Sequence, residues 1–198
     1  MGCIAGVTQF PADRRVMDKP FCSCCGARIE VRIPPGDHLP RRVCPACGVV
    51  HYENPRFVVG CVPELEGRIL LCLRAIEPRR GYWTVPAGFM ENGETLEAGA
   101  ARECYEEALA QVQIGSLLAV VNIPEAHQVH VFFRARLTSS AFGVGEESLD
   151  ARLVDPADVP WDALAFPSTR FALRCHLRAG GNPEPLPQLT TLARRHPG

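Results

Sequence analysis

Three glutamates that share one face of a predicted helix are the clearest sign of chemistry in the sequence. Glu103, Glu106 and Glu107 lie in a segment rich in Ala, Leu, Glu and Arg, whose composition predicts a helix over residues 95–110. At about 100° per residue, the three side chains fall on one face of that helix. Like charges at this spacing disfavour an isolated helix, and a bound divalent cation would turn their repulsion into binding. The alternative is a solvated acidic face on which Arg102 pairs with Glu106.

Four cysteines in two Cys-x-x-Cys pairs form a second cluster with metal-binding spacing. They are Cys22, Cys25, Cys44 and Cys47, and a glycine follows each pair. Four thiolates can close tetrahedrally around Zn²⁺ and stabilise a segment too short to bury a core. Because such a site leaves no open position, we expect a structural zinc. Redox-active or disulfide-bonded pairs are the alternative, and Cys24 or His51 could replace one ligand.

The bulk composition indicates a globular protein with one ordinary domain and a small accessory module. The 198 residues are 46% hydrophobic and 22% charged, with a formal net charge of −1. This balance argues against a nucleic-acid or membrane partner, so an anionic substrate would need local cations or bound metal. No apolar run approaches the roughly 20 residues of a membrane span, and the first twenty residues have no signal-peptide core. We therefore expect a cytoplasmic protein.

The segments that must position the two clusters alternate between strands and helices after Pro55. Five apolar stretches predict strands, at residues 57–62, 68–74, 113–121, 128–137 and 149–154. Residues 64–67 form a turn, residues 82–86 are extended, residues 87–93 form a glycine-bearing loop, and residues 167–179 form a second helix. The strand at 128–137 alternates apolar and polar residues, which predicts burial on one face. In the apolar stretches, Cys61, Cys72 and Cys175 are expected to be buried thiols.

Four segments follow from this division, a mixed α/β domain and three smaller parts. They are a loose extension at residues 1–20, a zinc ribbon at 21–53, the α/β domain at 54–179 and a poorly ordered, Pro-rich tail at 180–198.

The segment around the acidic helix resembles the Nudix box, G-x5-E-x7-R-E-U-x-E-E-x-G-U, in which U is a bulky apolar residue. Six positions match in register, namely Gly88, Glu94, Arg102, Glu103, Glu106 and Glu107, and Cys104 fills the first apolar position. Leu109 departs from the pattern because the family has glycine there. A leucine in a left-handed conformation costs about 1–2 kcal/mol. Since residues 108–111 are good helix formers, we expect the helix to continue past Leu109.

The resemblance implies a Nudix α/β/α sandwich with a mixed sheet, preceded here by the zinc ribbon. It further implies catalytic Mg²⁺ or Mn²⁺ ions that bridge a diphosphate while water attacks phosphorus. The implied ligands are the carboxylates of Glu103, Glu106 and Glu107 and the carbonyl of Ala87. Glu94 and Arg102 would orient those ligands.

Family members often supply a further glutamate from a loop beyond the box, as a metal ligand or general base. Glu147 is our first choice for this role, followed by Glu146 and Glu125. The ordinary explanation for each is an exposed loop charge.

The similarity extends from residue 21 to residue 179 and is greatest to one branch of the superfamily. That branch includes bacterial ADP-ribose pyrophosphatases and FAD pyrophosphatases of plant plastids, and residues 51–55, 81–89 and 160–161 carry the likeness. The S-Q-P-W-P-F-P-x-S signature of NADH pyrophosphatases has no match in this sequence, which argues against NADH. We therefore expect Mg²⁺-dependent hydrolysis of FAD or ADP-ribose with release of AMP. NADH, dinucleoside polyphosphates, nucleoside triphosphates, a non-catalytic nucleotide sensor and a nucleic-acid-binding ribbon are the alternatives.

Substrate contacts are assigned to one cation and three aromatic residues. They are Arg74, Tyr82, Trp83 and Phe89. Phe132 and Phe133 are further stacking candidates, although aromatic side chains are more often part of a core. His127 and His130 are expected to be ordinary strand residues. The family also suggests a small-molecule nucleotide as the partner and a possible homodimer.

Overall fold

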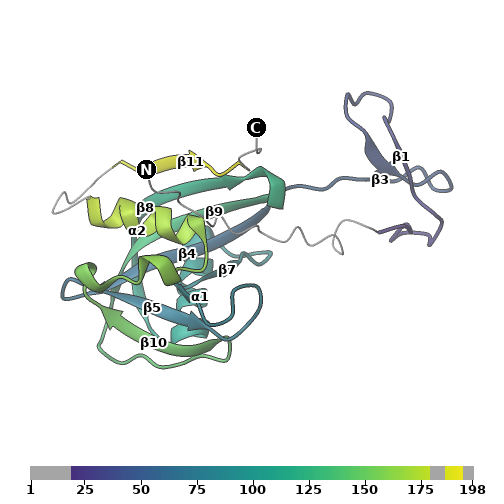
Figure 1. Cartoon of the computed structure of the whole chain (residues 1–198). Helices are drawn as coiled ribbons and strands as arrows, with labels where there is room; N and C mark the ends of the chain where they lie inside the picture. Colours follow the sequence, from purple (N-terminus) through teal and green to yellow (C-terminus); the bar gives the residue numbers. More distant parts are fainter. Residues whose placement is uncertain (1–18, 179–185, 194–198) are drawn as a thin grey trace. The chain divides into compact units, whose positions relative to one another are not determined.

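The computed structural model describes residues 19–178 and 186–193, which form two compact units (Figure 1). The division falls between Asn54 and Pro55. In the described residues, the first unit has a three-stranded sheet and the second an eight-stranded sheet. Each unit therefore has a hydrogen-bonded sheet of its own.

The N-terminal unit is a short antiparallel sheet with few buried apolar side chains. Its strands are β1 (Glu30–Arg32), β2 (Arg41–Val43) and β3 (Val50–His51), in the order β1-β2-β3. Val43, Cys22 and Cys44 are buried, whereas Phe21 and Val31 are largely exposed. So small a core cannot stabilise a fold without further cross-links.

The larger unit is built on a mixed sheet. Its main path runs β10-β5-β4-β9-β8-β11, and two short strands join it, β6 to β5 and β7 to β4. The bounds are β4 (Arg56–Leu65), β5 (Arg68–Arg74), β6 (Trp83–Thr84), β7 (Ala87–Phe89), β8 (Val112–Ile123), β9 (Gln128–Leu137), β10 (Ser148–Val154) and β11 (Gln188–Thr191). The pairs β4–β9 and β8–β11 are parallel and the others antiparallel.

One helix covers each face of this sheet, α1 (Leu96–Ala108) and α2 (Pro167–Arg178) (Figure 1). The alternation in β5 shows the two layers, because Leu70 packs in one buried cluster with Ala100 of α1 and Leu71 packs in the other with Leu173 of α2. The described part of the unit also has three short 3-10 helices, η1 (Pro124–Ala126), η2 (Pro156–Asp158) and η3 (Trp161–Ala163). The predicted α/β/α sandwich is therefore confirmed.

Strand β9 is buried on both faces, which corrects the prediction of a half-buried strand. Phe132 is 1% exposed and lies in the α2-side cluster, whereas Phe133 is 4% exposed and lies in the α1-side cluster. Both rings are core residues and cannot stack on a substrate. His127 is not a strand residue, because it ends η1 in a left-handed conformation with φ of 52°.

Polar contacts fix the start of α2 on the sheet. Ser168 lies 3.0 Å from Nδ1 of His130, and Thr169 lies 3.1 Å from the hydroxyl of Thr84. The other ring nitrogen of His130 lies 2.9 Å from Gln128. Burial lowers the pKa of His130 to about 4, so the ring is neutral in the folded protein near pH 7. His130 is thus a structural residue of the core.

Several predicted elements have different limits in the structure. β4 runs on to Leu65, and the hairpin turn consists of Glu66 and Gly67, both with positive φ. The predicted loop at 87–93 contains β7. Cys61, Cys72 and Cys175 are buried as expected.

The C-terminal tail contains a strand where we expected poor order. Gln188–Thr191 form β11, which pairs with β8. Residues 180–185 and 194–198 of the predicted tail, and residues 1–18 of the predicted extension, lie outside the described residues. Within the described residues, no helix has both the length and the apolar character needed to cross a membrane.

Candidate active site and zinc cluster

The helix that carries the acidic residues begins at a side-chain cap. Thr95 has an extended backbone, and its hydroxyl accepts a hydrogen bond from the Ala98 amide at 3.2 Å. Glu97 places a negative charge in the first turn, where the helix dipole favours it. These features fix the start of α1 directly after the glycine-bearing loop.

The same helix ends at Ala108, so the expectation that it continues past Leu109 is wrong. Leu109 adopts the left-handed conformation, with φ of 51°, and its amide donates to the Tyr105 carbonyl at 2.7 Å. The carbonyl of Ala108 accepts from the Gly143 amide at 2.7 Å, and that of Glu107 accepts from the Gly145 amide at 3.0 Å. Two satisfied helix-end carbonyls, each worth about 1 kcal/mol, offset the conformational cost of Leu109.

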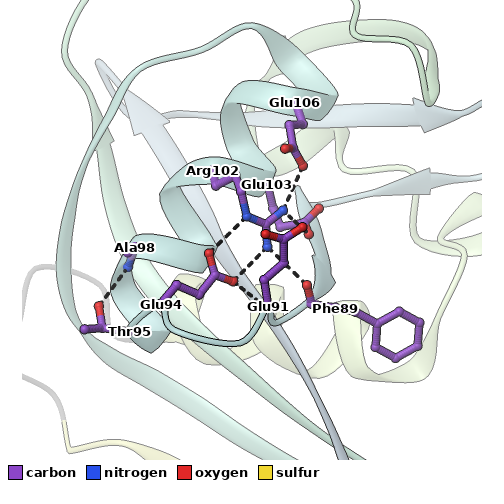
Figure 2. Close-up of polar contacts among 8 residues, drawn as sticks. All are labelled: Phe89, Glu91, Glu94, Thr95, Ala98, Arg102, Glu103 and Glu106. Carbon is purple, nitrogen blue, oxygen red and sulfur yellow. Dashed lines mark hydrogen bonds and ion pairs between the residues drawn. The ribbon is translucent and has the colours of Figure 1, made fainter.

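Arg102 joins the helix to the preceding loop (Figure 2). Its guanidinium donates, at 2.8–3.1 Å, to the carboxylates of Glu94, Glu103 and Glu106 and to the carbonyl of Phe89. Glu94 also accepts from the Glu91 amide at 2.7 Å. The hydrogen bonds from Arg102, with that of Glu91, lower the pKa of Glu94 to about 2. Glu94 and Arg102 therefore form a charged framework that fixes the loop and two of the acidic side chains.

Two of the three helix glutamates are buried and point into the domain. Glu103 is 8% exposed and Glu107 is 5% exposed, while Glu106 is the most exposed of the three. Burial raises the pKa of Glu103 despite its ion pair with Arg102. Burial, followed by the charge of Glu103, raises the pKa of Glu107 to about 8. The carboxylates of Glu103 and Glu107 therefore lie together in a poorly hydrated part of the domain.

Two further observations show that these carboxylates fit a divalent cation. Among the described residues, Oε2 of Glu107 is buried without a hydrogen-bond partner, which ordinarily costs about 1–3 kcal/mol. A Cβ atom on Gly88 would lie 2.3 Å from Oε2 of Glu103, so only glycine lets that carboxylate rest against the loop. Oxygen ligands on a helix and an adjoining loop are what Mg²⁺ or Mn²⁺ requires.

Ala87 and Glu147 adjoin the acidic helix, because Gly88, next to Ala87, rests against the Glu103 carboxylate, and Gly145, two residues before Glu147, donates its amide to the Glu107 carbonyl at 3.0 Å. A backbone hydrogen bond from Ala87 opposes the rise in the pKa of Glu107, so β7 adjoins that side chain. The charge of Glu147 contributes to the raised pKa of both Glu103 and Glu107. The structure therefore brings Ala87 and the first-choice loop glutamate to the acidic helix.

The other two loop glutamates have weaker geometric support. All three loop glutamates are exposed, Glu146 beside Glu147 and Glu125 on η1, so exposure does not separate them. Glu147 is favoured because its charge raises the pKa of Glu103 and Glu107.

The residues assigned to substrate binding lie in different surroundings. The charge of Arg74 acts on Glu107, its Nε donates to the Pro78 carbonyl at 3.0 Å, and its guanidinium lies 5.0 Å from the ring centre of Phe166. Trp83 packs against the α2-side core, under the guanidinium of Arg152. Arg74 is thus close to the acidic helix, whereas Trp83 belongs to the opposite side of the sheet.

The two remaining aromatic residues are partly exposed and stacked by arginines. Tyr82 lies under Arg79 with a separation of 5.2 Å. Phe89 is 47% exposed and lies 4.6 Å from the guanidinium of Arg56. In Figure 2 the Phe89 ring points away from the carboxylates, although its carbonyl contacts Arg102. Its ring can contact only a part of a substrate that extends beyond the glutamates.

Sequence reasoning missed two glycines and one aromatic residue near the site. Gly143 and Gly145 cap α1 directly before the Glu146-Glu147 pair. Their spacing, one residue apart before two glutamates, is a signal that could have been used. Phe166 approaches Arg74 only because α2 folds back on the sheet, and the local sequence carries no sign of it.

The four predicted zinc ligands come together in the N-terminal unit. Their Sγ atoms lie within 4.8 Å of one another. The shortest described separations are 3.4 Å for Cys25–Cys44 and 3.7 Å for Cys22–Cys47. Such a set of sulfurs fits tetrahedral Zn²⁺.

The glycine that follows each cysteine pair makes a tight turn. The amides of Gly26 and Gly48 donate to the carbonyls of Cys22 and Cys44 at 2.9 Å, and both glycines have positive φ. These turns bring backbone amides close to the sulfurs.

The two alternative zinc ligands have other positions. Cys24 is exposed, and only its amide contacts the cluster, at 3.4 Å from Sγ of Cys22. Nε2 of His51 lies 3.3 Å from the same sulfur, which is hydrogen-bonding distance to a thiolate. Burial opposes ionisation of Cys22, but hydrogen bonds from the amides of Cys24 and Cys25 and from His51 lower its pKa to about 5.

An α/β/α sandwich whose first helix presents paired Arg-Glu and Glu-Glu residues beside a glycine-bearing loop defines a class of hydrolases. The chain belongs to that class, the Nudix family, since a model of the NUDIX domain matches residues 54–173. A second model, of the Nudix N-terminal zinc ribbon, matches residues 20–53.

Similar proteins include hydrolases with different named activities. A crystal structure of a NUDIX hydrolase from Nitrosomonas europaea is 48% identical, with a TM-score of 0.83 over 87% of this chain and 98% of that one. An ADP-ribose pyrophosphatase of Methanocaldococcus jannaschii is 30% identical over 58% of this chain and 69% of the relative. The NAD-capped RNA hydrolase NudC of Stutzerimonas stutzeri is 29% identical over 84% of this chain, which spans 59% of NudC.

Proposed function

We propose that this Nudix hydrolase cleaves the diphosphate bond of ADP-ribose or FAD and releases AMP. The observation that carries the proposal is the buried pair Glu103 and Glu107, with an unpartnered oxygen on Glu107 and Glu147 close by. Bound metal cations would compensate the carboxylate charge that the protein alone leaves without a partner, and would in turn attract the anionic diphosphate.

In this mechanism Glu103, Glu106 and Glu107 would hold the metal ions, and the Ala87 carbonyl would be a further ligand. Mg²⁺ or Mn²⁺ would neutralise charge on the phosphoryl oxygens and activate the attacking water. Glu147 accepts the proton of that water. Glu103 and Glu107 are buried, which limits the access of other water on their side of the reacting phosphorus.

Arg102 and Glu94 act by positioning. Arg102 reaches Glu103 and Glu106 at 2.8 Å each, while Glu94 fixes its other side. A fixed ligand geometry matters to the reaction, because misplacement by about 1 Å can cost 100-fold in rate.

The choice of substrate rests on the chemistry around the acidic helix and on the relatives. Arg74, beside Glu107 and stacked on Phe166, supplies a cation for a phosphate oxygen. The relative named ADP-ribose pyrophosphatase supports that substrate. FAD has the same AMP diphosphate joined to a different group. A relative named NAD-capped RNA hydrolase makes NADH and NAD-capped RNA the main competitors, although their signature has no match in this sequence.

A substrate screen tests the proposal. ADP-ribose, FAD, NADH, NAD-capped RNA, diadenosine polyphosphates and nucleoside triphosphates would each be incubated with Mg²⁺ or Mn²⁺. We expect AMP with ribose 5-phosphate, or AMP with FMN, and ¹⁸O from labelled water on one product phosphate. Cleavage of NADH, capped RNA or a triphosphate about tenfold better, in kcat/KM, would refute the substrate assignment and leave the diphosphate chemistry in place.

Three other expectations stay predictions. They are a cytoplasmic location, a homodimer and the choice between Mg²⁺ and Mn²⁺.

A further inference from the structure

The segment from Gly143 to Glu147, here called the clasp, ties the end of α1 to the edge of the sheet. At the helix, the amides of Gly143 and Gly145 donate to the carbonyls of Ala108 and Glu107. At the sheet, the carbonyl of Glu147 accepts from the Ala75 amide at 2.8 Å. The clasp is therefore fixed at both ends, with one residue, Glu146, between its anchors at Gly145 and Glu147.

The two glycines differ sharply in the space around them. A Cβ atom on Gly145 would lie 1.7 Å from the Glu106 carbonyl oxygen and 2.8 Å from the carbonyl carbon. Both atoms are helix backbone, so no side-chain rotation can relieve the overlap. A Cβ atom on Gly143 would meet only the Leu109 side chain, at 3.2 Å from its Cδ1. That side chain is partly exposed and can move.

The spacing between the two anchors sets the position of Glu147. The amide of Ser148 donates to the Gly145 carbonyl at 3.1 Å, so a tight turn joins Gly145 to the start of β10. Ser148 is itself paired with Arg74 of β5. Glu147 thus lies between a helix end and a strand pair, and its charge acts on Glu103 and Glu107.

We propose that Gly145 is a positioning residue, whose missing side chain lets the clasp lie on the backbone of α1 and so places Glu147 beside the helix glutamates. This inference rests on the proposed function, because it assigns Glu147 the proton-accepting role. Any side chain at position 145 would lift the clasp from α1 and move Glu147 away from the reacting water.

Kinetics of two matched glycine variants test the proposal. Gly145→Ala should lower kcat by roughly 10- to 100-fold with little change in KM, since a misplaced base affects the reaction more than binding. Gly143→Ala should stay within about twofold of the wild type. The decisive comparison is a double-mutant cycle with Glu147→Gln. If Gly145 acts through Glu147, the double variant will be no slower than Glu147→Gln alone, whereas multiplied losses would overturn the proposal.

Two further measurements test the proposal if Gly145→Ala does not fold, or without relying on turnover. If Gly145→Ala does not fold, Glu147→Asp draws the carboxylate back by one methylene and leaves the backbone contacts of the clasp unchanged. Full activity in that variant would contradict the inference. Crystal structures of the wild type and Gly145→Ala with Mn²⁺ supply a readout without turnover. A Glu147 carboxylate that keeps its distance to Glu107 in the variant would overturn the positioning role. A wild type inert toward every diphosphate would instead refute the proposed function.

Discussion

The zinc ribbon and the Nudix domain bury apolar side chains on very different scales. The ribbon encloses little besides Val43 and its own cysteines, whereas the Nudix domain has one buried cluster on each face of its sheet. A metal in the ribbon must therefore supply folding free energy, and a metal at the acidic helix need not. The Nudix domain can accept buried like charges at Glu103 and Glu107 because its core stabilises the fold independently. A domain whose core already stabilises the fold can therefore use a metal site for chemistry instead of for folding.

Zinc removal should give the largest effect and separate the two units. Cys44→Ser, or treatment with a strong chelator, should unfold the ribbon and leave the Nudix domain folded, because only the ribbon lacks a core. Amide NMR signals of residues 19–54 should collapse to random-coil positions while those of the Nudix domain persist. Elemental analysis should find about one zinc per wild-type chain. Cys24→Ser is the control and should bind zinc normally, and a ribbon that stays folded without zinc would contradict the comparison.

Replacing one helix carboxylate by an amide should lower activity and leave the domain folded, whereas zinc removal should unfold the ribbon. Glu106→Gln and Glu107→Gln should each lower turnover by roughly 100-fold or more, about 2.7 kcal/mol, because each weakens metal binding. The melting temperature of metal-free Glu107→Gln should not fall, since the amide replaces a buried carboxyl of nearly equal size whose Oε2 has no hydrogen-bond partner. Glu97→Gln, exposed in the first turn of α1, is the matched control. Near-normal turnover in both site variants would refute their roles.

His130 should give the Nudix domain an acid sensitivity of its own, independent of the zinc in the ribbon. Its pKa is about 4 when folded against 6.5 ordinarily, so the unfolded chain binds more protons between these values. Stability from this residue is therefore complete above pH 6.5 and falls as the pH drops toward 4, by at most about 3 kcal/mol. Urea unfolding of the wild type and His130→Gln at several pH values would measure it. An equally steep loss in the variant would exclude His130 as the cause.

His51 should tune the zinc cluster without joining it. Its Nε2 lies 3.3 Å from Cys22 Sγ, where an N–H group can donate to the thiolate. His51→Gln should weaken zinc binding by about tenfold, as second-layer contacts usually do, measured by competition with a chromophoric chelator. The absorption spectrum of the Co²⁺-substituted protein should keep its all-sulfur form. A spectrum that changes on substitution would mean that His51 is itself a ligand.

The smallest effect should come from Leu109. Its left-handed backbone costs about 1–2 kcal/mol, which Leu109→Gly would relieve. Two effects reduce that gain in unfolding free energy. The variant loses the contact of the Leu109 side chain with the clasp, and glycine gives the unfolded chain more conformational freedom. We expect a net gain in unfolding free energy below about 1 kcal/mol, measured in urea. A loss of more than about 1 kcal/mol would show that the packing of Leu109 outweighs its backbone strain.

Local patterns in the sequence were enough to predict much of the Nudix domain. Strand β9 has the predicted limits, Gln128–Leu137, because alternation is a local property. The acidic helix and the four gathered cysteines also follow from spacing alone. In each case the residues that decide the structure are neighbours in the chain or share a motif.

What could not be predicted depends on partners distant in sequence. Leu109 ends α1 because the amides of Gly143 and Gly145 donate to the carbonyls at the end of the helix. No residue close to Leu109 in the sequence predicts these contacts. Phe132 is buried because α2 covers the second face of the sheet. Trp83 also packs on the side of the sheet that α2 covers. Its aromatic side chain alone therefore could not show whether it lies in the core or at the substrate site.

Strand β11 has a practical consequence for producing the protein. Gln188–Thr191 cover one edge of β8, pairing with Ala119 to Asn122 in parallel register. An uncovered sheet edge is a template on which other chains assemble. Recombinant chains shortened to end at Arg178 would present that edge during expression and should aggregate, whereas affinity tags placed after Leu192 leave the pairing whole. Solubility screens of C-terminal truncations should therefore change abruptly at β11.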